Sequence, residues 1–142
     1  MLLAAVVVGC GGDDKDPATP GPGTCVNMGS ATYSGTEDVV VNSGPCPGYT
    51  DLALTFTIVQ SAGSCDFTLQ NSLVSGHTFQ GTVSGSDVSW TGSYPSASGT
   101  VTIDSVDAQL SADLTALTGS FTWTYAGNTS CTGTTSFDLV RQ

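Results

Sequence analysis

An alternation of apolar and polar residues runs along the chain from Ala31 onward and restricts it to antiparallel strands. Apolar side chains take every second position and Thr, Ser, Asp or Gln fall between them, as in strands with one buried and one solvent-facing side. Strong helix formers such as Lys, Glu, Arg and Met are scarce, which disfavours a helical fold. The alternating positions are Leu52, Leu54, Phe56, Ile58; Cys65, Phe67, Leu69; Phe79, Gly81, Val83; Val88, Trp90, Gly92, Tyr94; Val101, Ile103; Leu117, Gly119, Phe121, Trp123, Tyr125; and Cys131, Gly133, Thr135, Phe137, Leu139.

Short turn signals separate these segments, and with residues 31–41 as the first strand the pattern predicts eight strands joined mostly as hairpins. We therefore expect an all-β fold, an antiparallel up-and-down meander of about eight strands closed into a small barrel, with a β-sandwich as the alternative. The phase slips between Ile103 and Val106, which predicts a bulge or bend. Glycines in the apolar phase permit sharp coiling where a sheet closes. They are Gly81, Gly92, Gly119 and Gly133.

Four of the five cysteines lie within the strand region and predict two disulfides, since one His in the whole chain argues against a zinc site. In a meander, Cys25 before the first strand and Cys65 before the third lie at one end of the barrel. Cys46 and Cys131 then lie at the other end. A barrel of this kind is roughly 20 Å tall, too long for a disulfide to cross. The predicted pairs are Cys25–Cys65 and Cys46–Cys131.

The fifth cysteine follows a short apolar run, Leu2 to Val8, which is far below the ~20 residues of a membrane-spanning helix. The segment Val7-Val8-Gly9-Cys10 resembles the lipobox of bacterial lipoproteins. In that family the signal peptide is cut before the cysteine, which becomes the lipidated first residue. The resemblance therefore implies a signal peptide at 1–9, lipidation of Cys10 and anchoring to a membrane. No positive segment precedes Leu2, which indicates a start codon further upstream.

Residues 11–24 contain no large apolar side chain and are rich in Gly, Pro and Asp, so we expect 10–24 to be a lipidated cysteine followed by a disordered linker. Residues 25–142 then form the β-barrel domain. Gly11, directly after Cys10, is not the Asp that retains some lipoproteins at the inner membrane, which favours the outer membrane. The sequence thus predicts a monomeric, lipid-anchored protein of the bacterial cell envelope.

Catalytic patterns are absent from the sequence. No G-x-S-x-G elbow occurs, His77 is the only His, and neither zinc-site spacings nor a phosphate loop before a helix is present. We expect His77 to be an ordinary histidine at the barrel rim. The carboxyl pairs Glu37–Asp38 and Asp104–Asp107 are expected to be solvated surface charge. The chain is therefore predicted to be no enzyme and to need no cofactor or metal.

The formal net charge of −10 excludes a nucleic-acid binder of the basic-patch kind. A non-catalytic structural or binding barrel, with an envelope protein or small molecule as partner, is the main functional hypothesis. The alternative is a lipocalin-like carrier of a small apolar ligand, an analogy from architecture alone. Seven inward Phe and Trp favour a filled interior over a hollow cup. The residues that would line such a cup are Trp90, Tyr94, Trp123 and Tyr125.

Overall fold

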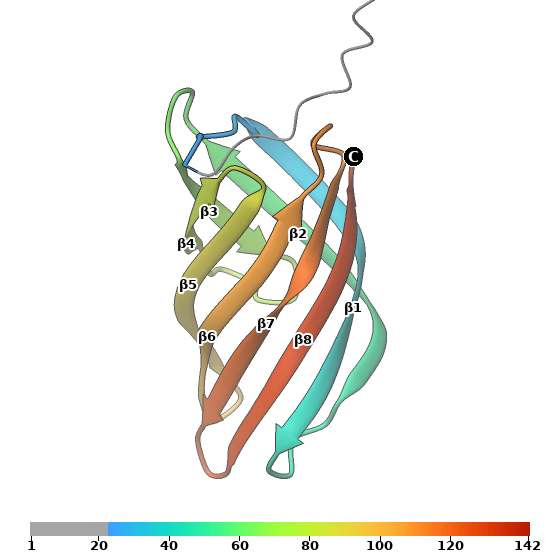
Figure 1. Ribbon diagram of the computed structural model, residues 1–142. Helices are drawn as coiled ribbons and strands as arrows, with labels where there is room; N and C mark the ends of the chain where they lie inside the picture. The colour runs from blue at the N-terminus through green and yellow to red at the C-terminus, as the bar shows by residue number, and fades with distance from the viewer. Residues whose placement is uncertain (1–22) are drawn as a thin grey trace, which may run out of the picture.

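Eight antiparallel strands close into a barrel in the computed structural model, which describes residues 23–142 (Figure 1). Each strand pairs with the next, and the last pairs with the first, which confirms the predicted meander. Within 23–142 no helix is long and apolar enough to cross a membrane. The predictions for 1–9, Cys10 and 11–22 lie outside the described residues. The strands are β1 (Ser30–Ser43), β2 (Tyr49–Gln60), β3 (Asp66–Asn71), β4 (Phe79–Ser84), β5 (Asp87–Ser96), β6 (Gly99–Leu110), β7 (Ala116–Ala126) and β8 (Ser130–Arg141).

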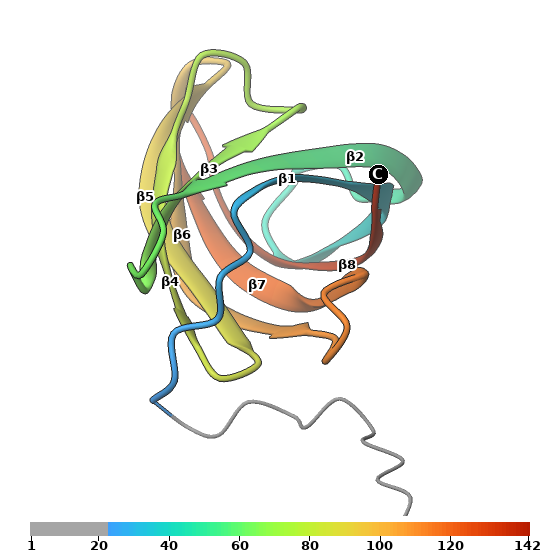
Figure 2. The ribbon, with the colours of Figure 1, turned by 90° about the horizontal axis from the view of Figure 1, so that it is seen from above.

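The two ends of the barrel differ in the segments that lie at them. One end, drawn uppermost in Figure 1, is where residues 23–29 lead into β1 and where the C-terminus follows β8. We call residues 23–29 the strap and this end of the barrel the strap end. Looking onto that end, Figure 2 shows this N-terminal segment passing in front of the barrel. We call the opposite end, with the turns 44–48, 97–98 and 127–129, the mouth.

One disulfide lies at each end, in the predicted pairs. Cys25 joins Cys65 at the strap end, with their Cα atoms 4.8 Å apart. Cys46 joins Cys131 at the mouth across 6.1 Å. Since pairing across the ends was impossible in a meander, the topology alone decided this connectivity.

The strap end is closed by the N-terminal segment itself. Val26 and Met28 are buried against the barrel interior. The Gln60 side-chain nitrogen Nε2 donates to the Val26 backbone carbonyl at 2.9 Å. The Met28 backbone amide donates to the Gln60 side-chain oxygen Oε1 at 2.6 Å. The Arg141 guanidinium donates to the Met28 carbonyl at 3.1 Å. These bonds satisfy the polar groups that closure of this end buries.

Aromatic side chains fill the middle of the barrel. The Phe56 ring lies edge-on to Trp90 and to Phe137, with ring centroids 5.5 Å apart in both pairs. Phe121 lies 5.9 Å from Trp90 and 6.3 Å from Phe137. These are ordinary packing distances for buried aromatic rings. The predicted filled interior is therefore present at this level.

Two of the inward glycines make room for further aromatic rings, those of Phe67 and Trp123. Phe67 pairs across the sheet with Gly81 and Trp123 pairs with Gly133, and a Cβ built at either glycine would meet the ring of its partner. At Gly119 a Cβ would instead meet the backbone of β6. Close approach of a ring or a strand is thus the reason for glycine at these three positions.

The barrel wall is irregular on the mouth side. The predicted bulge lies in β6, where Asp104 is the extra residue between Ile103 and Ser105 in the register with β7. Strands β3 and β4 are short, and β2 pairs with β3 only from Phe56 to Gln60. Beyond that point the loop 72–78 continues the wall beside β2, and the Ser72 amide donates to the Thr55 carbonyl at 2.9 Å.

Candidate functional site

Glu37 lies inside the barrel, and the expectation that it is a surface charge is wrong. Its side chain is only 7% exposed. Along β1 the residues Ala31, Tyr33, Glu37, Val39 and Val41 are all at odd positions, which face inward, so Asp38 alone of the adjacent pair faces solvent. This phase was visible in the sequence, and the general rarity of buried carboxyls outweighed it. The other expected surface carboxyls, Asp104 and Asp107, are exposed.

Glu37 and Tyr94 both take inward positions of their strands. The two residues belong to β1 and β5, which are opposite strands of an eight-stranded barrel. Burial, with a smaller contribution from the charge of Glu37, raises the pKa of the Tyr94 hydroxyl. Desolvation raises the pKa of Glu37 from 4.5 to about 7, because burial penalises the charged carboxylate. The carboxyl and the phenol are therefore both weakly hydrated inside the barrel.

The side chains around this space are aromatic or apolar, and several are only half-buried. Tyr94 lies 6.1 Å from His77 and 6.0 Å from Phe79, measured between ring centroids. The Trp123 indole N–H donates to the Thr135 hydroxyl at 3.2 Å. The half-buried residues packed against the core at the mouth include Val39, Val41, Tyr94 and Tyr125. The inward residues at the mouth thus keep contact with solvent, whereas the strap end is sealed.

The four residues predicted to line a cup do not form one continuous surface. Trp90 is buried in the central aromatic cluster. Trp123 is also buried and is fixed by its bond to Thr135. Tyr94 and Tyr125 lie at the mouth, half-exposed. The tyrosines are therefore accessible to a ligand, and the tryptophans are part of the core.

His77 is half-buried at the rim, where it packs against Tyr94 and Phe79. Within residues 23–142 no serine or carboxyl forms a hydrogen bond or ion pair with the His77 ring. Among residues 23–142 no group of three or more His, Cys, Asp or Glu side chains comes together that could hold a metal ion.

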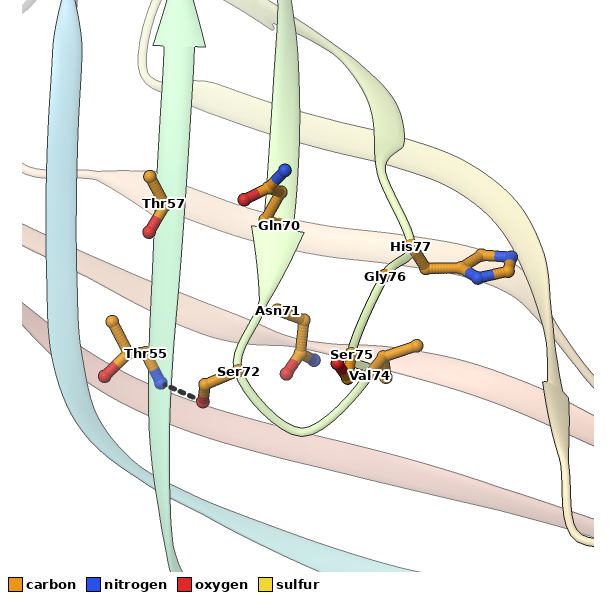
Figure 3. Close-up of a pocket in the computed structure, with 9 residues that line it drawn as sticks. All are labelled: Thr55, Thr57, Gln70, Asn71, Ser72, Val74, Ser75, Gly76 and His77. Atoms are coloured by element: carbon orange, nitrogen blue, oxygen red, sulfur yellow. Dashed lines mark hydrogen bonds between the residues drawn. The ribbon is translucent and has the colours of Figure 1, made fainter.

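Two grooves lie on the outer wall and are weaker candidates. One, of about 280 Å³, runs between β2 and the loop 72–78, where the Thr55 amide donates to Ser72 Oγ at 3.0 Å (Figure 3). His77 borders it, but its ring points away from Thr55 and Thr57. The other, of about 380 Å³, lies over β3, β4 and β5 and has one charged side chain, Asp66. Their linings are mostly short hydroxyl and amide side chains, and neither groove contains a buried charge.

Comparison with known proteins gives no family to which this chain can be assigned. No protein-family model matches it, and no curated protein is significantly similar to it in sequence. The mouth around Glu37 is therefore identified from its geometry and chemistry.

The Glu37 carboxyl should make stability depend on pH. Its pKa is about 7 in the folded protein and near 4.5 in the unfolded chain, so the folded state binds more protons between these values. Glu37 therefore makes its full contribution to the free energy of unfolding below the lower pKa, and this contribution is lost as the pH rises through the upper pKa. We expect a loss of about 2 kcal/mol, less than the full shift implies because the carboxyl keeps some contact with solvent.

Urea unfolding of the wild type and of Glu37→Gln, on either side of this pH window, measures the effect. The difference between the two proteins isolates Glu37 from the surface carboxyls, which both retain. The variant should gain stability relative to wild type as the pH rises. A difference that stays constant with pH would contradict the assignment.

Proposed function

We propose that this chain is an exported, lipid-anchored protein of the bacterial cell envelope whose barrel is a non-catalytic binding module. The observation that carries the proposal is the pair of disulfides, one at each end of the barrel. Structural disulfides persist in exported proteins and are rare in the cytosol of most organisms. The resemblance of residues 7–10 to a lipobox supplies the anchor, Cys10, and favours the outer membrane.

The placement of the two ends supports a binding role. The chain enters the barrel at the strap end, and the mouth is at the opposite end. A barrel tethered through its N-terminal side would therefore present the mouth away from the membrane. The nine acidic residues of 23–142 face a single basic one, Arg141, which discourages adsorption to anionic surfaces and suits a monomeric module held by its tether.

A carrier of a small apolar ligand is the second candidate, and the half-buried Tyr94 and Tyr125 at the mouth favour it. The aromatic cluster of Phe56, Trp90 and Phe137 fills the middle of the barrel, between the mouth and the strap end. A ligand would accordingly sit in the mouth rather than in a deep cup.

Mass spectrometry of the protein expressed with its leader in a bacterium tests the anchor. Trypsin cleaves after Lys15, so processing and acylation should yield a peptide of residues 10–15 carrying lipid on Cys10. Globomycin, which inhibits the lipoprotein signal peptidase, should make the precursor accumulate. Cys10→Ser should abolish the lipidated peptide, make the precursor accumulate even without globomycin and leave the barrel folded, and an unmodified Cys10 in the wild type would end the lipoprotein proposal.

A further inference from the structure

The Glu37 carboxyl has no partner of opposite charge. Among residues 23–142 the only Lys or Arg is Arg141, and its guanidinium binds the Met28 carbonyl at the far end of the barrel. No side-chain or backbone donor of the described residues makes a hydrogen bond to the Glu37 carboxyl. A carboxylate that is more than nine-tenths buried and unpaired is costly, and a cation placed beside it would remove that cost.

The carboxyl is nevertheless reachable. In residues 23–142 every side-chain nitrogen or oxygen that is fully shut off from solvent has a hydrogen-bond partner. Because the Glu37 oxygens have none, they must keep some exposed surface. Val39 and Val41, the next inward residues of β1 toward the mouth, are half-buried. The carboxyl is therefore not sealed off, and the part of β1 between it and the mouth is itself incompletely buried.

The mouth also offers surface for the body of such a molecule. Tyr94 points inward from β5, the strand opposite β1, with His77 and Phe79 packed beside it. Tyr125 is half-buried at the same end. Aromatic faces attract organic cations and bury apolar groups, so they complement both parts of a charged amine.

We propose that the mouth of the barrel binds an organic amine in its protonated form, with the ammonium group held by the Glu37 carboxylate and an aromatic or apolar body against Tyr94 and Tyr125. This inference rests on the proposed binding function and names its ligand class.

Phenethylammonium and its neutral analogue 2-phenylethanol test the inference, with binding followed by tryptophan fluorescence or by nuclear magnetic resonance shifts. The wild type should bind the amine at least about tenfold more tightly than the alcohol, as expected for a hydrogen bond between charged groups. Glu37→Gln should lower amine affinity to that of the alcohol and leave alcohol binding unchanged. The unchanged alcohol affinity shows that the mouth of the variant is intact.

Asp38→Asn is the matched control, since it removes the adjacent charge on the outer face and retains an acceptor for the Asp51 amide. It should leave the preference for the amine unaltered. Equal binding of amine and alcohol by the wild type would overturn cation recognition and support the apolar carrier. Binding of neither probe would also overturn the inference. Both results are independent of the lipidation of Cys10, which is measured separately.

Discussion

Removal of the Cys46–Cys131 disulfide is expected to lower the free energy of unfolding by about 4 kcal/mol, the entropy of closing so long a loop in the unfolded chain. The two cysteines are separated by 85 positions in sequence. The bond also fixes the loop between β1 and β2 to the start of β8, at the end of the barrel that has no strap. A loss of this size is a large part of the total stability of a small domain, which is about 5–15 kcal/mol.

The double variant Cys46→Ala/Cys131→Ala, compared with wild type by urea unfolding under oxidising conditions, measures this loss. Replacing both residues avoids a free thiol that could form wrong pairs. Cys25→Ala/Cys65→Ala is the companion variant. It removes the disulfide that closes the shorter loop, with a sequence separation of 40. A loss below about 1 kcal/mol in the first variant would contradict the loop-entropy explanation.

Phe56→Ala is expected to cost about 3–5 kcal/mol, the usual range for deleting a buried aromatic side chain. Phe56 is 1% exposed and is the shared partner of Trp90 and Phe137 in the central cluster. Its removal would leave a cavity that the surrounding strands cannot easily close, since all eight are held by their neighbours in one closed barrel. Because Trp90 touches the deleted ring, its fluorescence should also change.

Val59→Ala is the control on the same strand, since Val59 faces outward and is 53% exposed. It should cost less than about 1 kcal/mol, the span of strand propensity at an exposed position. If Phe56→Ala costs no more than this control, the interior is a loosely filled cup rather than a packed core.

Much of the fold could be predicted because it depends on local patterns. The period of two placed the strands, and the phase slip near Ile103 located the bulge, which the register assigns to Asp104. The disulfides followed from topology, since the meander places Cys25 beside Cys65 and Cys46 beside Cys131. These inferences needed only neighbours in sequence and the alternation of strand direction.

The features that were missed depend on residues far apart in the chain. Gln60 bonds to Val26 and Met28 to close the strap end, and nothing in the sequence near any of the three indicates this. Glu37 was misplaced for another reason: its phase pointed inward, but the general rarity of buried carboxyls outweighed that signal. Buried polar groups are placed by tertiary packing, so their sites are the least visible in a pattern.

The Cys25–Cys65 bond also determines how the barrel responds to a mechanical load. A force applied through the chain before residue 23 reaches Cys25 before it reaches β1. The disulfide transfers that load to Cys65, directly before β3, so β1 is not the first element to be pulled. Peeling of β1 away from β2 and β8 is then resisted by a covalent bond, and the barrel should stay intact under a pull from its N-terminal side.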